Sequence, residues 1–316
     1  MIFSATSKKN FEKKILSREH EDFGVIKHIE TELKRKRGWV FQLPKPEQPV
    51  VLLLSGGLDS IVAWHLLMKK YGLMVYPLVI NKGMKRTHLE MRSVKYYSKL
   101  YQKLFPDLYQ APFHINLPLT EISIGQAVFT EKVHPLVILE NLTDSAALKL
   151  SLSLGSSILT PFVAKLYAQF LYSTQHLTIK TIFCAVTKGD GENSLVPEQT
   201  FTALRTMMWS LCVLTRDYEW QYASVALEKE LGNFLSKADL IAWADQHQIP
   251  LEHTWTCYHP SIDQTHCGEC ITCSDRIKSF EKVGVIDRTI YYDQKASLYR
   301  RLIDKFKLFI RYYFNL

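Results

Sequence analysis

Residues 50–60 read VVLLLSGGLDS, and this stretch decides the fold. Its first five residues form a continuous apolar run, which is typical of a strand buried on both faces. A glycine pair follows, and a helical pattern then runs from about Leu58 to Lys70 and stops at Gly72. The stretch therefore predicts a buried strand, a tight loop and a helix, in that order.

The same alternation continues along the chain. Further strand-like stretches are Leu73–Ile80, 111–115, 179–186 and 222–228. Further helix-like stretches are about 88–104, 160–174, 200–213 and 237–248, whereas 120–158 has no clear period. Alternating strands and helices predict an α/β fold with a doubly wound, mostly parallel sheet of the Rossmann-like kind.

The loop after the first strand has the composition of an anion site. Two glycines let the backbone approach an oxyanion closely, and the next helix points its free N–H groups at the same place. Asp59 is suited to hold a Mg²⁺ counter-ion. The alternative is a tight connection without a ligand. The predicted phosphate-binding residues are Leu54, Ser55, Gly56, Gly57, Leu58, Asp59 and Ser60.

Four of the six cysteines fall within 17 residues. They are Cys257, Cys267, Cys270 and Cys273. Four thiolates complete a tetrahedral Zn²⁺ site and leave no open position for substrate, so we expect a structural metal. An iron–sulfur cluster uses similar spacings and stays open as an alternative. Nearby histidines could replace a thiolate, namely His253, His259 and His266.

Composition sets the class of protein. The chain has 316 residues, of which 47% are hydrophobic and 22% charged, and this is ordinary globular composition. No apolar run approaches the roughly 18 residues of a membrane span, and no secretory signal is visible near Met1. We therefore expect a cytoplasmic protein without a membrane span.

The excess positive charge lies at the two ends. Residues 1–48 and 298–316 each carry a net charge of +4, and the residues between them are neutral. This pattern fits either solvated helix faces or an acidic partner, protein or nucleic acid. The segment 298–311 is typical of a basic amphipathic helix, which could dock on the body, dock on a second subunit in a homodimer, or bind a membrane surface.

Proline-rich sequence marks a boundary just before the first strand. Residues 44–49 contain three prolines and cannot form a helix or a central strand. We therefore expect four parts. They are a basic N-terminal extension (1–48), an α/β nucleotide-binding domain (49–250), a zinc-binding segment (251–283) and a basic helical tail (284–316).

Residues 55–60, with the pattern S-G-G-x-D-S after a strand, resemble the PP-loop of ATP pyrophosphatases. These enzymes split ATP into AMP and pyrophosphate, and use the AMP half to activate a carboxyl or carbonyl oxygen. The resemblance implies that Ser55, Gly56, Gly57, Asp59 and Ser60 hold the pyrophosphate end of ATP.

The cysteine segment sharpens the resemblance. Residues 254–258 and 266–273, together with Arg276, are similar to the zinc segment of 7-cyano-7-deazaguanine synthases (QueC-like enzymes). Residues 236–239 resemble that family's S-K-A-E helix start, and 185–190 resemble its G-V-x3-D loop. Ser236 is also a residue type suited to cap a helix. The likeness covers about 50–282 and omits both basic ends.

The resemblance implies a carbon–nitrogen ligase of queuosine biosynthesis. A 7-deazaguanine carboxylate would be adenylated by ATP and attacked by ammonia, which gives the amide and, after a second activation, the nitrile. Lys237 would then neutralise charge near the phosphates, and Asp190 would hydrogen-bond the base. The family's polar positions near the base have changed at 85–90, 161–164 and 196–198, so the activation chemistry is better supported than the substrate.

Two rival interpretations stay open. QueC-like proteins also occur in antiviral operons, and there an amine of a protein or nucleic acid could take the place of ammonia. The other alternative is a catalytically silent nucleotide-binding module. Release of pyrophosphate, and the mass of the product, would separate the three.

Overall fold

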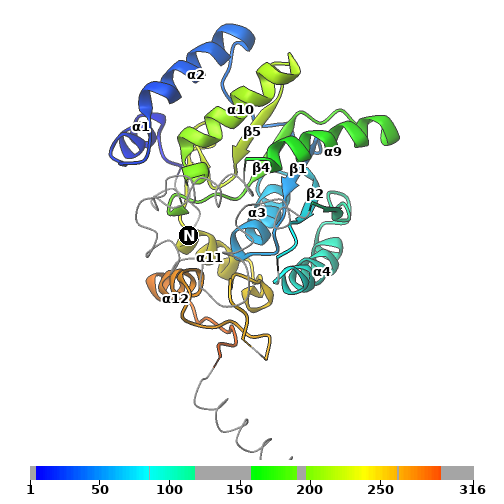
Figure 1. The fold of residues 1–316 in the computed structure, drawn as a ribbon, viewed down its shortest axis with the longest axis vertical. Coiled ribbons are helices and arrows are strands. Elements are labelled where there is room, and N and C mark those ends of the chain that lie inside the picture. Colours follow the sequence, from blue (N-terminus) through cyan, green and yellow to red (C-terminus); the bar gives the residue numbers. More distant parts are fainter. Residues whose placement is uncertain (1–4, 85, 118–157, 191–196, 262, 293–316) are drawn as a thin grey trace, which may run out of the picture.

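The computed structural model describes residues 5–84, 86–117, 158–190, 197–261 and 263–292 (Figure 1). Its main sheet has five strands in the order β3-β2-β1-β4-β5, and all four pairings are parallel. The strands are β1 (Pro49–Leu53), β2 (Met74–Asn81), β3 (Phe113–Asn116), β4 (Thr181–Cys184) and β5 (Gln221–Ser224). The predicted doubly wound α/β fold is therefore confirmed.

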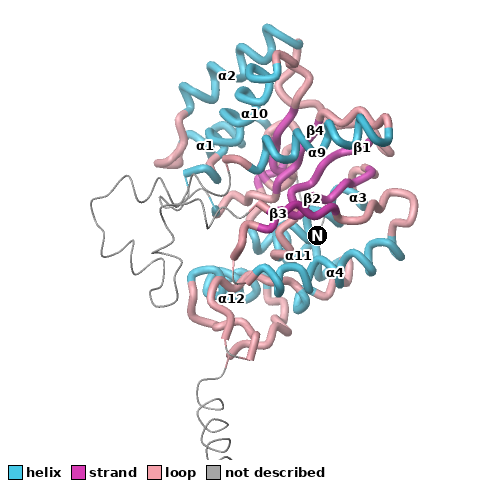
Figure 2. Tube along the Cα trace, turned by 45° about the vertical axis from the view of Figure 1, so that its right-hand side comes forward, coloured by secondary structure: helices cyan, strands magenta, loops and turns pink. Residues whose placement is uncertain are grey.

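Helices cover both faces of this sheet (Figure 2). On one face lie α9 (Thr160–Gln175) and α10 (Phe201–Thr215). On the other lie α3 (Leu58–Lys69), α4 (Thr87–Leu104) and α11 (Lys237–Gln246). The helix α3 is buried almost all round, with Trp64 fully covered, because it packs between the sheet and its neighbours α4 and α11.

The central strand β1 fixes where a ligand can bind. Its residues Val50, Val51 and Leu52 are fully buried, as expected of a strand between two helical layers. It pairs with β2 on one side and with β4 on the other. The strands β2 and β3 are added on one side of β1 and the later strands β4 and β5 on the other, so the strand order reverses at β1. Open α/β sheets bind ligands at such a switch point, outside the carboxyl ends of the strands. The loop that begins at Ser55 lies there.

The basic N-terminal stretch packs against the sheet domain. Its helices α1 (Lys8–Leu16) and α2 (Phe23–Arg37) lie beside α10 (Figure 1). Phe11, Ile15 and Leu33 are almost fully buried and belong to the same hydrophobic core as β1. Each of these helices therefore carries basic side chains in its last turn and buries its apolar side chains against the body.

A buried charge network fastens the N-terminal helices to the body. Arg205 of α10 donates two hydrogen bonds of 2.8 Å to Glu228 and one of 3.0 Å to Glu30 of α2. Lys229 also bonds to Glu30 and reaches Glu12 of α1 at 3.0 Å. Arg205 and Glu228 are fully buried, so each charge depends on its partner.

Replacing Arg205 with methionine should destabilise the protein by about 3–5 kcal/mol, because it leaves the buried Glu228 carboxylate without its cation. The free energy of unfolding in urea measures this. Arg35→Met is the matched control, since Arg35 lies exposed on α2 and forms a surface ion pair with Glu32. An equal loss in both variants would contradict a structural role for the network.

The remaining elements lie near the C-terminal part of the described chain. They are a short antiparallel pair, β6 (Leu227–Glu228) and β7 (Asn233–Phe234), two 3-10 turns (Pro197–Gln199 and Leu251–His253), and α12 (Ile271–Val283). The predicted strand 222–228 is wrong in one respect, because it breaks after Ser224 and its last residues turn back to pair with β7. The predicted helix 298–311, and 120–157 of the aperiodic stretch, lie outside the described residues. In the part of the chain that the structure describes, no helix has the length and apolarity needed to cross a bilayer.

Candidate active site

The glycine loop joins β1 to α3. Gly57 is the residue that caps α3, so the first N–H groups of that helix have no partner within the helix and open toward the loop. Ser55 Oγ lies 3.0 Å from Ser60 Oγ and accepts a 3.2 Å hydrogen bond from the Gly57 N–H. Ser60 Oγ also donates to the Gly57 carbonyl at 3.0 Å. Both hydroxyls therefore lie at the amino end of α3, where each can rotate toward a bound anion.

The carbonyl of Gly56 is held from two sides. It accepts a 2.7 Å hydrogen bond from the buried Ser93 hydroxyl of α4 and a 3.0 Å bond from the N–H of Trp255. Because the peptide is planar and trans, fixing this carbonyl also fixes the N–H of Gly57 on the opposite side. Ser93 and Trp255 were not predicted from the sequence, and they set the orientation of the loop.

Gly56 tolerates a side chain less well than Gly57. Its φ of +80° favours glycine, and a Cβ there would lie 2.5 Å from the Glu90 carbonyl oxygen. Gly56→Ala should therefore displace the loop and lower the predicted ATP cleavage by about 100-fold. Gly38→Ala is the matched control, because Gly38 has a φ of +83° with nothing within 4 Å, and it should cost stability alone. Equal turnover by the two variants would contradict the positioning of the loop.

Charged groups gather at the amino end of α3. The ammonium group of Lys237, the first residue of α11, lies 3.4 Å from the Asp59 carboxylate. It also forms an ion pair with Asp275 of α12. Asp190, in the loop after β4, is close enough to influence both Lys237 and Asp59 electrostatically. Three of the predicted site residues, Asp59, Lys237 and Asp190, therefore lie together, and Asp275 joins them without having been predicted.

The cluster holds more negative than positive charge, and the directions of the pKa shifts agree with this balance. Burial raises the pKa of Asp59, and Asp190 and Asp275 add to the rise while Lys237 opposes it. Burial lowers the pKa of Lys237, but the three carboxylates more than offset this and hold it above its ordinary value. Asp59 Oδ1 is buried and makes no hydrogen bond within the described residues. One ammonium group thus faces three carboxylates, which suits a further cation.

Local hydrogen bonds fix the loop that carries Asp190 and the start of α11, which carries Lys237. Asp190 Oδ2 accepts bonds from the N–H and the hydroxyl of Thr187, at 2.6 and 2.9 Å, so Asp190 is held by its own loop. Ser236 caps α11 in a capping box with Asp239, which confirms the predicted helix cap. This cap places Lys237 at the start of its helix, pointing toward Asp59.

The four predicted cysteines come together. The sulfur atoms of Cys257, Cys267, Cys270 and Cys273 all lie within 4.8 Å of one another. Two pairs, Cys257 with Cys270 and Cys267 with Cys273, are separated by 4.0 and 3.9 Å. The N–H groups of Cys267 and Cys270 each point at a cluster sulfur at 3.3 Å, which is the way proteins stabilise thiolates.

The nearby polar residues have structural partners. His266 Nε2 accepts a 3.2 Å hydrogen bond from the Thr256 N–H, and His253 stacks on Tyr96 with ring centroids 3.8 Å apart. Arg276 is fully buried and donates to the Thr254 hydroxyl and the Leu251 carbonyl at 2.7 and 2.8 Å. Arg276 therefore stabilises the chain that leads into the cysteine segment.

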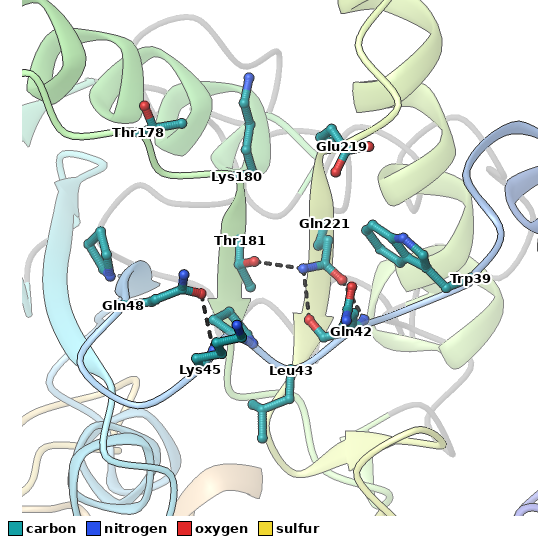
Figure 3. Close-up of a pocket in the computed structure, with 12 residues that line it drawn as sticks. Trp39, Gln42, Leu43, Lys45, Gln48, Thr178, Lys180, Thr181, Glu219 and Gln221 are labelled. Atoms are coloured by element: carbon teal, nitrogen blue, oxygen red, sulfur yellow. Dashed lines mark hydrogen bonds between the residues drawn. The ribbon is translucent and has the colours of Figure 1, made fainter.

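One cavity of about 320 Å³ lies elsewhere (Figure 3). Its lining includes Pro49, Thr181 and Gln221, which begin the strands β1, β4 and β5. The amide of Gln221 is engaged by Gln42 and by the Thr181 hydroxyl. This cavity is at the amino edge of the sheet, opposite the glycine loop, and is separate from the candidate site.

Comparison with protein families gives one match over most of the chain. The model described as "Queuosine biosynthesis protein QueC" matches residues 49–284. The 7-cyano-7-deazaguanine synthase of Chelativorans sp. (strain BNC1) is 39% identical over 82 residues, which cover 26% of this chain and 33% of the relative. The enzyme of the same name from Rhizobium meliloti (strain 1021) is 43% identical over 72 residues, 23% of this chain and 29% of the relative. The chain thus spans about a third of the length of these curated relatives.

Among solved structures, one similar chain is the U34-tRNA thiolase NcsA from Methanococcus maripaludis with its 4Fe-4S cluster. The match covers 90% of both chains, with 13% sequence identity and a TM-score of 0.37.

Proposed function

This chain belongs to the QueC family, and from that membership we propose that it is an ATP-dependent ligase that activates a 7-deazaguanine carboxylate. The carboxylate oxygen attacks the innermost phosphorus of ATP, pyrophosphate leaves, and ammonia then displaces AMP to form the amide. The observation that carries the proposal is the clustering of Asp59 and Lys237 beside a glycine loop at the carboxyl edge of the sheet.

The loop would bind the departing pyrophosphate. Negative charge grows on this group during the reaction, and fixed N–H dipoles at the start of α3 stabilise it best where it develops. The hydroxyls of Ser55 and Ser60 lie at the same helix end and supply further donors. The ammonium group of Lys237 would neutralise charge on the phosphates.

The carboxylates fit a Mg²⁺ ion that accompanies ATP. Mg²⁺ binds oxygen ligands and usually keeps one or two protein carboxylates beside substrate phosphates. Asp59, whose Oδ1 has no hydrogen-bond partner among the described residues, and the nearby Asp190 are the residues that would hold it. When bound, the ion neutralises charge on the leaving group.

The cysteine cluster fits a single Zn²⁺ ion. A Zn–S bond of about 2.3 Å gives sulfur–sulfur separations of about 3.8 Å in a tetrahedron. Two of the sulfur–sulfur separations, 3.9 and 4.0 Å, agree with this geometry, and all of them are within 4.8 Å. An iron–sulfur cluster inserts several metal atoms between its thiolates and holds them farther apart. We therefore propose a structural zinc, held by Cys257, Cys267, Cys270 and Cys273.

The proposal is tested by incubating the full chain with ATP, Mg²⁺, 7-carboxy-7-deazaguanine and ammonium. We expect pyrophosphate release that depends on the carboxylate, and a product with the mass of the amide or the nitrile. Tight ATP binding without pyrophosphate from this carboxylate would contradict the proposal and favour a silent binding module. Pyrophosphate release together with a mass gain on an added macromolecule would instead indicate another acceptor amine.

A further inference from the structure

The helix of the cysteine segment reaches the ATP loop through one side chain. Asp275 lies two residues after the metal-ligand candidate Cys273, in the first turns of α12. Its carboxylate pairs with Lys237, and the same ammonium group lies 3.4 Å from Asp59. An ionic bridge therefore runs from α12 through α11 to the first turn of α3.

The two ends of this bridge differ in exposure. The Asp275 side chain is 52% exposed, whereas the side chain of Lys237 is only 11% exposed and that of Asp59 22%. Asp275 thus lies at the rim and Lys237 beneath it. Lysine carries its charge on a flexible four-carbon stem, so partners on both sides of the ammonium group restrict its orientation. Here a carboxylate from each of two helices does so.

The helix that carries Asp275 packs against α11 and against the cysteine cluster. Cys273, two residues before Asp275, is fully buried in this cluster. The neighbouring Arg276 is tied to Thr254 and Leu251. The position of Asp275 is therefore set by the metal segment and not by the loop that binds ATP.

From this geometry we propose that Asp275 is a positioning residue for the activation step. It holds the ammonium group of Lys237 in place at the amino end of α3, so that Lys237 meets the charge that grows on the phosphates. Asp275 itself does not contact ATP. This inference rests on the proposed ATP chemistry and adds to it the residue that links the metal segment to that chemistry.

The test is Asp275→Asn in the full chain, assayed by pyrophosphate release with ATP, Mg²⁺, 7-carboxy-7-deazaguanine and ammonium. We expect kcat to fall by about 10- to 100-fold, because a misplaced catalytic group loses most of its effect. The KM for ATP should change little, since Lys237 acts on charge present mainly in the transition state. Metal content and thermal stability should stay at the level of the unmodified chain.

Glu281→Gln is the matched control, because Glu281 lies exposed on the same helix and loses the same charge. Asp275→Glu keeps the charge and should restore part of kcat. The double variant with Lys237→Met should be no slower than Lys237→Met alone, since Asp275 acts only through Lys237.

Three results would overturn the inference: full kcat in Asp275→Asn, an equal loss in Glu281→Gln, or additive losses in the double variant. If the unmodified chain releases no pyrophosphate, the proposed function fails and this inference falls with it. If the unmodified chain is active and Asp275→Asn matches it, only the role of Asp275 is wrong.

Discussion

Asp59→Asn should lower pyrophosphate release by at least about 1,000-fold while the fold stays intact. The variant removes the negative charge of one of the two carboxylates that pair with Lys237, and this carboxylate is also the one proposed to hold Mg²⁺. Losses of this size are expected when charge stabilisation of a departing group is removed. Asp59→Ala should have the same effect on turnover.

The free energy of unfolding of Asp59→Asn should not decrease, although its turnover does. Burial and the neighbouring carboxylates raise the pKa of Asp59, so the ionised group is less favourable in the folded protein than in the unfolded chain. This cost is fully present when the pH is above the pKa of Asp59 in the folded protein, which is about 6. It falls as the pH is lowered toward the ordinary pKa of an aspartate in the unfolded chain, and it is absent below that value. A neutral asparagine removes the cost at neutral pH, and the free energy of unfolding should therefore not decrease.

Asp245→Asn serves as the control for Asp59→Asn. Asp245 lies exposed near the far end of α11, and its replacement changes the net charge by the same amount. Turnover should stay within about twofold of the unmodified chain, as for most surface substitutions. Comparable losses in both variants would indicate a general effect of charge, and would count against a specific role for Asp59.

The parts of the site that could be predicted are those encoded by local sequence. The apolar run of β1, the glycine pair and the helical period of α3 follow one another along the chain, and their structure depends on neighbours only a few residues away. The cysteine spacing has the same property, because close spacing brings thiolates together whatever the rest of the fold. Ser236 was predicted as a helix cap for the same reason.

The parts that could not be predicted depend on distant packing. Ser93 holds the Gly56 carbonyl only because α4 lies against the loop, and Asp275 meets Lys237 only because α12 packs on α11. Each is an ordinary polar residue of a helix in the sequence. Gly56 and Gly57 also looked equivalent, and the φ of Gly56 and the close Glu90 carbonyl distinguish them.

The prediction of one strand over 222–228 was wrong for a related reason. The residues of this stretch are apolar except for Ser224 and Glu228, and neither of these shows in the sequence that the parallel sheet ends at Ser224. The following residues instead pair with Asn233–Phe234, which are too short to stand out as a strand in the sequence. The bend brings Glu228 to Arg205, and so the buried charge network also depends on an element that local pattern does not show.

Cys267→Ser should remove the bound metal and destabilise the C-terminal segment together. Structural zinc contributes roughly 10–16 kcal/mol of binding energy in small zinc domains, and this energy appears as folding energy. We expect the zinc content, measured by elemental analysis, to fall from one ion per chain to near zero, and the thermal unfolding temperature to fall with it. A chelator should bring the unmodified chain to the same state. Visible absorption by the purified chain would indicate iron and sulfide in place of zinc.

The same variant tests the link between the two sites. The N–H of Trp255, two residues before Cys257, holds the Gly56 carbonyl, and Asp275 holds Lys237. Loss of the metal should therefore weaken ATP binding through the displaced loop and lower kcat through the displaced Lys237. Cys184→Ala is the control, because Cys184 is buried in the main core and away from the cluster, and it should keep its full metal content. A Cys267→Ser chain that stays stable and metal-loaded would show that the metal assignment is wrong. One that loses metal but binds ATP normally would show that the cysteine segment does not position the loop.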